Sequence, residues 1–361
     1  MSREDNYCKK IKDYIFMKLL GRGAYSSVWL AYNLYSEKFY AIKSIEHEER
    51  NTAQRELDFN KRLLESKNLK ILKDSFEDEE NTYMVFNLYG GSLYELYKYN
   101  TIPPKVLLRI YESAVSKIRE LHKGFKCLHG DIKPESFMYR GKNPICKDFI
   151  ERFTELGGIK AFLSKTNNNM KEALDLLKKE LYCEEDFNSD LFSVYNSSNE
   201  SGSESNTTEY EKDSFSEESN ESKQENEDEG NEDESSSSEE SDLSTTSSSF
   251  SNSSVDSVIL DYRLTEEEID NLKIDLIDYS HVHTLSDDLK FEPTRYYRCI
   301  ETLEGKPAGY YKDWYALATT MYELENREIF ADPQSEDKDE EQINYIKENM
   351  HKLEKWLYKP K

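Results

Sequence analysis

Cysteines and long apolar runs are scarce in this chain of 361 residues, and basic residues are outnumbered by acidic ones. The five cysteines are odd in number and contain no C-x-x-C pair, which argues against a disulfide framework or a zinc site and favours a reducing compartment. No run approaches the about 18 apolar residues that a membrane span needs, and residues 1–12 lack the apolar stretch of a secretory signal. We therefore expect no membrane association and a cytoplasmic location, a nuclear location, or both.

The charge is strongly negative and unevenly spread. Lys and Arg number 48 and Asp and Glu number 73, for a net charge of -25, which argues against direct binding of nucleic acid. Residues 196–256 consist mainly of Ser, Glu, Asp and Asn and carry 19 acidic residues against two lysines. This composition predicts a disordered spacer. It is either a solvated linker or an acidic segment regulated by serine phosphorylation.

The remaining sequence predicts strands first and helices afterwards. Short apolar alternations at 14–20, 27–32, 38–45 and 83–88 favour antiparallel strands. Helical spacing follows at 54–64, with Leu57 and Leu64 on one face, and again at 106–122. This order predicts an α+β chain with two lobes.

Two early features are typical of a phosphate-binding site. A strand, a Gly21-x-Gly23 turn and a second strand follow one another, and glycines allow backbone N–H groups to approach phosphates, although an ordinary hairpin has the same pattern. Lys43 ends the next strand, where a buried ammonium needs a counter-charge, and Glu56 on the following helix is its natural partner. The alternative is that both are ordinary surface residues.

Two acidic segments could carry catalysis and bind a metal ion. The loop at 127–137 contains Asp131, which could accept a proton from a hydroxyl, and Lys133, which could neutralise a transferring phosphoryl group. Farther along, Asp278 closes an apolar strand and suits a hard cation such as Mg²⁺, with Asp275 as the competing candidate.

In this order, the residues resemble the eukaryotic protein kinase family. The segments at 21–30, 84–87, 129–136 and 294–301 are similar to the SR-protein kinases, and so is the position of the long insert between Asp131 and Asp278. The resemblance implies a bilobal fold with an N-lobe at 1–88, a C-lobe in two parts at 89–195 and 257–361, and a spacer at 196–256.

The resemblance also implies phosphoryl transfer from ATP with Mg²⁺. Asp131 and Lys133 would be catalytic, and Asp278 and Ser136 would hold the metal. The residues implied in binding ATP are Gly21, Gly23, Ser26, Val28, Ala41, Lys43, Glu56, Phe86, Asn87 and Tyr89.

Several positions depart from the family pattern. Gly130 replaces the arginine before the catalytic aspartate, which predicts activity without an activation-loop phosphate. Ser136 replaces an asparagine, and Ser280 replaces a glycine after the metal-binding aspartate. We therefore expect weaker metal binding and restricted backbone torsion. The chain ends about 48 residues after Asp313, which predicts a reduced kinase of lower stability.

The expected function is a monomeric serine/threonine kinase that phosphorylates serine in basic, Arg/Ser-rich splicing factors. The acidic residues Asp337, Asp339 and Glu341 would dock substrate arginines, unless they form only a solvated helix start. The alternative function is a pseudokinase scaffold that binds a basic partner without phosphoryl transfer.

Overall fold

The computed structural model describes residues 7–23, 26–182, 263–286, 293–307, 309–332 and 339–357. These residues belong to one compact unit, formed by Met1–Glu200 and Leu260–Lys361. The expected spacer at 196–256 lies outside the described residues.

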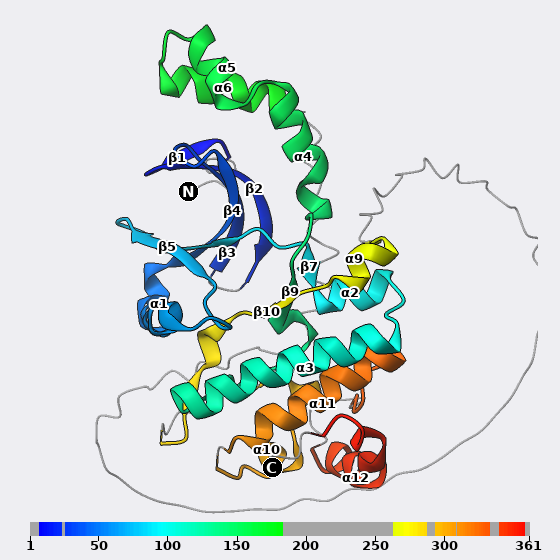
Figure 1. Cartoon of the computed structure of the whole chain (residues 1–361). Helices are drawn as coiled ribbons and strands as arrows, with labels where there is room; N and C mark the ends of the chain where they lie inside the picture. Colours follow the sequence, from blue (N-terminus) through cyan, green and yellow to red (C-terminus); the bar gives the residue numbers. More distant parts are fainter. Residues whose placement is uncertain are drawn as a thin grey trace, which may run out of the picture. The chain divides into compact units, whose positions relative to one another are not determined.

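A six-stranded antiparallel sheet forms the first lobe (Figure 1). Its strands follow the order β1-β2-β3-β4-β6-β5. Their bounds are Lys9–Ile11 (β1), Tyr14–Arg22 (β2), Ser26–Asn33 (β3), Lys38–Glu46 (β4), Leu72–Glu77 (β5) and Asn81–Asn87 (β6). Tyr14, Phe16 and Trp29 are buried in a single aromatic cluster, as expected for alternate residues that share one face of a curled sheet.

Helix α1 (Arg50–Arg62) packs beside this sheet through Ala53 and Leu57. It is followed by a 3-10 turn at Leu63–Glu65. The tighter turn buries Leu63 completely and leaves Leu64 40% exposed. The expectation that Leu64 shares the buried face of Leu57 is therefore wrong, because the α-helical spacing stops at Arg62.

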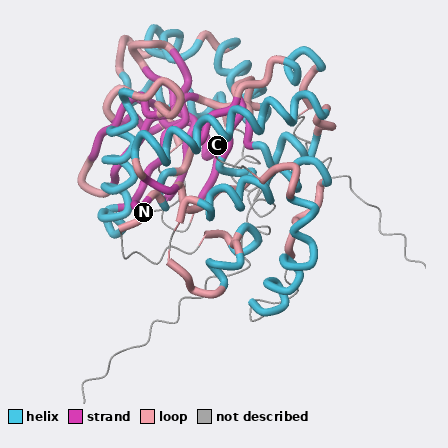
Figure 2. Tube along the Cα trace, turned by 60° about the horizontal axis from the view of Figure 1, so that its bottom comes forward, coloured by secondary structure: helices cyan, strands magenta, loops and turns pink. Residues whose placement is uncertain are grey.

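The second lobe is mainly helical (Figure 1), and Figure 2 shows the helices and strands along the chain by colour. Its central helices, α3 (Pro104–Glu120) and α11 (Tyr311–Asn326), contribute fully buried residues such as Ile118 and Leu317 to one core. The other helices are α2 (Leu93–Tyr99), α9 (Glu266–Asp270), α10 (Ile300–Leu303) and α12 (Asp339–Asn349).

Short strands bring distant parts of the second lobe together. Strand β9 (Phe137–Tyr139) pairs with both β7 (Gly91–Ser92) and β10 (Ile274–Leu276). Strand β8 (Cys127–Leu128) pairs with β11 (His283–Thr284). These pairings bring the loop around Asp131 next to the segment around Asp278.

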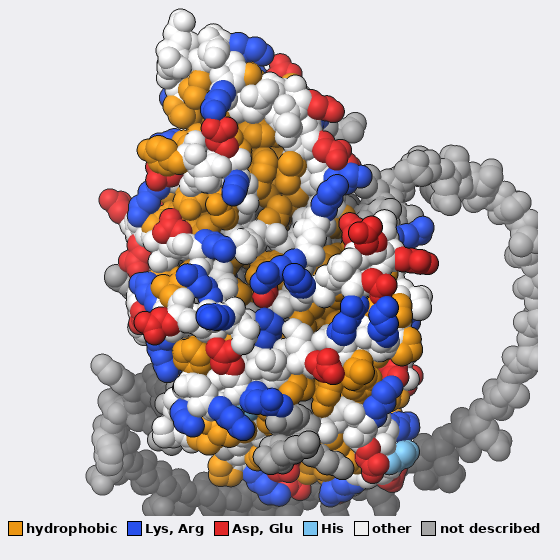
Figure 3. Space-filling view, in the orientation of Figure 1, with side chains coloured by type: hydrophobic (Ala, Val, Ile, Leu, Met, Phe, Trp, Pro, Cys, Tyr) orange, Lys and Arg blue, Asp and Glu red, His pale blue; other side chains and the backbone are white. Residues whose placement is uncertain are grey.

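Three helices depart from the expected domain boundary. Helices α4 (Pro144–Glu155), α5 (Gly158–Lys165) and α6 (Met170–Leu181) were expected to extend the C-lobe. They pack instead on the sheet of the first lobe, where Phe162 and Leu177 share a buried cluster with Ile15 and Met17. The physical reason is that β2 is apolar on both faces, so its second face needs a cover. In Figure 3, hydrophobic side chains are prominent in the upper part of the view, where Figure 1 shows α5 and α6.

None of the helices in the described part of the chain is both long and apolar enough to cross a membrane. The four cysteines described, Cys8, Cys127, Cys146 and Cys299, are buried.

Candidate active site

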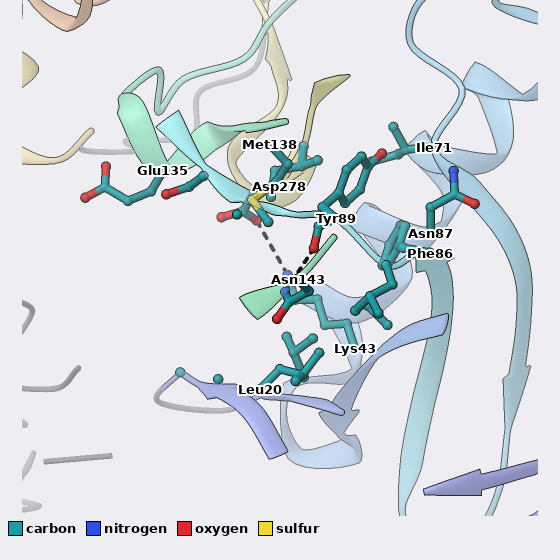
Figure 4. A pocket seen from close by; sticks show the side chains of 18 of the residues that line it. Leu20, Lys43, Ile71, Phe86, Asn87, Tyr89, Glu135, Met138, Asn143 and Asp278 are labelled. Atoms are coloured by element: carbon teal, nitrogen blue, oxygen red, sulfur yellow. Dashed lines mark hydrogen bonds and ion pairs between the residues drawn. The ribbon is translucent and has the colours of Figure 1, made fainter. Parts of the chain in front are cut away.

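A cavity of about 440 Å³ opens beside the turn between β2 and β3 (Figure 4). Strands β2, β3, β4 and β6 contribute to one wall, and β9 and the residues after β10 contribute to the other. All ten residues expected to bind ATP line it, and so does Asp278. Its walls carry apolar side chains with a few charged groups, the usual character of a small-molecule site.

Lys43, Glu56 and Asp278 form a charged group inside this cavity. The Nζ atom of Lys43 lies 2.8 Å from Glu56 Oε2 and 3.5 Å from Asp278 Oδ1. Burial alone would lower the pKa of Lys43, but the two carboxylates outweigh that effect and raise it. The ammonium therefore stays charged and is positioned for an anionic ligand.

The chain turns sharply at Asp278, whose φ of 60° lies in the left-handed region. The next residues, Tyr279–His281, form a 3-10 turn, and Tyr279 is buried against Phe59 of α1. Ser280 was expected to suffer from restricted torsion. It lies instead within that turn, and its Oγ donates to Asp278 Oδ1 over 2.8 Å. Serine therefore adds a hydrogen bond that glycine would lack.

The competing metal candidate, Asp275, lies elsewhere. It is buried in β10, where Arg140 Nε donates to its Oδ2 over 2.7 Å and Lys117 Nζ lies 3.4 Å from its Oδ1. Asp275 does not line the cavity. Its charge is already matched by two cations of the chain, so the structure favours Asp278 as the candidate.

Asp131 lies in the loop after β8, and three donor groups hold its carboxylate. Lys133 Nζ lies 2.8 Å from Oδ2, and the backbone N–H and hydroxyl of Thr294 donate to Oδ1 over 2.9 and 2.8 Å. Burial alone would raise the pKa of Asp131, but these charge-assisted contacts outweigh it and lower the pKa. Asp131 is therefore a carboxylate at neutral pH.

Asp313 of α11 fixes the backbone of the same loop. Its carboxylate accepts hydrogen bonds from the N–H groups of His129 (2.8 Å) and Gly130 (3.1 Å), and it lies 2.7 Å from His122 Nε2. Asp313 is 1% exposed, so these bonds are shielded from water. The loop is thus preorganised by the core of the second lobe.

Ser136 lies under this loop, next to the segment that carries Asp278. Its Oγ donates to the carbonyl of Asp131 over 2.7 Å, and its own carbonyl accepts from the N–H of Ile277 over 2.9 Å. The hydroxyl proton is engaged, and Ser136 is buried and does not line the cavity. Among the residues described, no group of three or more His, Cys, Asp and Glu could hold a metal by itself. Mg²⁺ sites that share the ion with phosphate need only one or two protein carboxylates.

The expected docking residues differ in their surroundings. Asp337 lies outside the described residues. Asp339 begins α12 and lies 2.8 Å from Arg295 of the same chain, and its role in docking a substrate arginine stays a prediction. Glu341 is an exposed residue in the first turn of α12.

The structure adds several residues to the site that the sequence analysis did not predict. Thr294 contacts Asp131 from 163 positions away, and sequence spacing gives no sign of that contact. Glu95, Glu135, Asn143 and Ile145 line the cavity. Glu135 lies within the loop at 127–137, so its place in that loop was a usable signal. Asn143 and Ile145 lie at the start of α4, within the range 89–195 that was expected to belong to the C-lobe.

Comparison with known proteins supports this geometry. The family model for the protein kinase domain matches residues 14–150. The fold is that of a protein kinase domain. The predicted bilobal kinase fold, with a strand-rich N-lobe and a helical C-lobe, is thereby confirmed.

Curated relatives of this region are named as kinases. A protein of Acanthamoeba polyphaga mimivirus named as a serine/threonine-protein kinase is 29% identical over 160 residues, 40% of this chain and 29% of the relative. Myosin light chain kinase A of Dictyostelium discoideum is 31% identical over 138 residues, 36% of this chain and 46% of the relative. Calcium-dependent protein kinase 4 of Plasmodium berghei is 30% identical over 154 residues, 40% of this chain and 28% of the relative.

The chain thus spans less than half the length of these curated relatives. None of the three is named as an SR-protein kinase, so the finer resemblance to that family stays a prediction.

Proposed function

We propose that this chain is a serine/threonine protein kinase that transfers the γ-phosphate of ATP to a hydroxyl of a protein substrate. The observation that carries the proposal is the arrangement of two charged groups. Lys43, Glu56 and Asp278 lie together in the cavity. Asp131 and Lys133 lie in the adjoining loop, where Thr294 contacts Asp131.

The cavity residues fit a nucleotide. Val28, Ala41 and Phe86 offer apolar surface for a flat base, and the backbone of Asn87–Tyr89 offers hydrogen bonds along its edge. Lys43 would bind phosphate oxygens, and Gly21 and Gly23 would let backbone N–H groups approach them.

The charged residues of the loop fit a proton acceptor and a charge stabiliser. Asp131, kept anionic by its partners, would orient the substrate hydroxyl and accept its proton. Lys133 would stabilise negative charge on the phosphoryl oxygens. Asp278 and Ser136 would hold Mg²⁺, which when bound neutralises charge on the triphosphate.

We further propose that the substrates are basic, as in Arg/Ser-rich proteins. Glu95 and Glu135 both line the cavity. Glu135 Oε2 is buried without a hydrogen-bond partner among the described residues. Burial raises the pKa of this carboxyl to about 7. An arginine of the substrate would supply the missing donor and restore the charge, because guanidinium and carboxylate form paired hydrogen bonds.

The test is transfer of the γ-phosphate to an Arg-Ser peptide in the presence of Mg²⁺, with Asp131→Asn as the matched variant. We expect incorporation by the wild type and a loss of at least 100-fold in Asp131→Asn, with nucleotide affinity retained. Nucleotide binding by the wild type without any transfer would contradict the proposal and favour the pseudokinase scaffold. An unchanged rate in Asp131→Asn would contradict the role of that carboxylate.

A further inference from the structure

Two polar side chains follow the candidate metal ligand, Asp278, and form a row of hydrogen bonds with it. Ser280 Oγ donates to Asp278 Oδ1 over 2.8 Å. The ring atom Nδ1 of His281 lies 3.0 Å from the same Oγ atom. Neither Ser280 nor His281 lines the cavity, so the row supports Asp278 from outside the space that a nucleotide would fill.

The direction of each hydrogen bond in this row follows from the number of protons available. Asp278 lies beside the ammonium of Lys43, and a carboxylate can only accept. The hydroxyl of Ser280 has a single proton, which the bond to Asp278 already uses. Its oxygen must therefore accept the second bond, and Nδ1 of His281 must donate it. His281 thus holds the Ser280 hydroxyl with its proton directed at Asp278.

Within the described part of the chain, the hydrogen bonds and ion pairs of the Asp278 carboxylate fall on one of its two oxygens. Oδ1 accepts from Ser280 and lies 3.5 Å from Nζ of Lys43 (Figure 4). The Asp278 side chain is 40% exposed and lines the cavity. Rotation of the carboxylate plane would break the bond from Ser280. The other oxygen, Oδ2, is thereby kept in one position with its lone pairs available to a cation.

The backbone that carries Ser280 is itself anchored. Tyr279 is buried, its ring packs against Phe59, and its hydroxyl donates to the carbonyl of Leu276 over 3.0 Å. The N–H of Val282 donates to the carbonyl of Tyr279 over 3.3 Å and closes the turn. The serine hydroxyl therefore reaches Asp278 from a fixed position.

We infer that Ser280 is a positioning residue that holds the Asp278 carboxylate in one orientation and so strengthens the binding of Mg²⁺ with a nucleotide. The inference rests on the proposed function, because it assumes that Asp278 binds the metal ion of the nucleotide. It is the opposite of the expectation from the sequence, in which the replacement of glycine by Ser280 accompanied weaker metal binding.

The experiment measures by calorimetry how tightly the full chain binds a non-hydrolysable ATP analogue, first with EDTA and then over a series of Mg²⁺ concentrations. The test variant is Ser280→Ala, which removes the hydroxyl and keeps Cβ. Ser280→Thr is the conservative variant, because it keeps a hydroxyl. The matched control is Ser286→Ala, since Ser286 is exposed in the same segment and its hydroxyl contacts Thr284 over 2.9 Å.

We expect Mg²⁺ to tighten the binding of the analogue to the wild type. In Ser280→Ala, the Mg²⁺ concentration that gives half of this effect should rise about fivefold, as expected for the loss of one hydrogen bond to a charged group. The affinity of this variant in EDTA should stay unchanged. Ser280→Thr and Ser286→Ala should respond to Mg²⁺ as the wild type does.

A response to Mg²⁺ in Ser280→Ala equal to that of the wild type would overturn the inference. A loss of affinity in Ser280→Ala that is the same in EDTA and in Mg²⁺ would also overturn it, because the serine would then be only a structural residue. A wild type that bound the analogue without any response to Mg²⁺ would overturn the inference and leave the nucleotide site intact. If the wild type bound the analogue under neither condition, the proposed function itself would fail.

Discussion

At the scale of single residues, the backbone conformation next to Asp131 explains why residue 130 is a glycine. Its φ is +86°, a conformation that side chains disfavour. A Cβ added there would lie 2.6 Å from the carbonyl oxygen of His281. The position therefore favours glycine, independently of any role in regulation.

The first prediction is that Gly130→Ala destabilises the protein by about 2 kcal/mol or more, because both the torsion and the contact with His281 are unfavourable. Chemical denaturation measures the change in the free energy of unfolding. Gly21→Ala is the matched control, because a Cβ at Gly21 meets nothing within 4 Å. Equal stability of the two variants would contradict the account of Gly130.

A second prediction concerns the pH dependence that Glu135 imposes. Its pKa in the folded protein is about 7, above the ordinary value of 4.5, so folding favours the protonated form. Its contribution to stability is therefore fully present below pH 4.5 and is lost as the pH rises through about 7.

Glu135→Gln removes this dependence. We expect the variant to melt a few degrees above the wild type at pH 8 and the difference to shrink towards pH 4.5. Thermal denaturation over this pH range is the measurement. Relative to the wild type, the same variant should show a higher KM for an Arg-Ser peptide and little change in KM for a peptide without arginine. A melting difference that does not change with pH would exclude the proposed titration.

At the scale of elements, the contacts of α4–α6 with the sheet are the main departure from the expected fold. These helices place Leu177 in the buried cluster on β2, with none of its surface exposed. The neighbouring Leu176 points away and is 38% exposed.

The third prediction compares these two neighbours. Leu177→Ala should cost about 2 to 5 kcal/mol, because it opens a cavity between α6 and the sheet. Leu176→Ala should change stability by less than about 1 kcal/mol, since the side chain is largely solvated. Denaturant unfolding of both variants gives the values. A small effect at Leu177 would mean that α6 does not cover the sheet in solution.

Local sequence signals predicted the elements that carry the site, and they did so for physical reasons. The Gly21-x-Gly23 turn, Lys43 and the loop around Asp131 each depend on residue types a few positions apart. The sequence also indicated that β2 needs a cover on its second face, because residues 14–20 are apolar on both faces. What local patterns cannot give is the partner of that second face, which lies beyond residue 143.

At the scale of the whole molecule, the candidate site depends on contacts between residues far apart in the chain. Lys43 meets Asp278 across 235 positions, and Asp131 meets Thr294 across 163. Pairing of β9 with β10 and the buried carboxylate of Asp313 bring these groups together. Only the order of the motifs, matched to a family, predicted this assembly.

The most direct test of the central claim is a crystal structure of the chain with Mg²⁺ and a non-hydrolysable ATP analogue. The account predicts the base along Asn87–Tyr89, phosphate oxygens within hydrogen-bonding distance of Lys43, and the metal ion bound by Asp278. A nucleotide outside this cavity, or a triphosphate that contacts neither Lys43 nor Asp278, would contradict it.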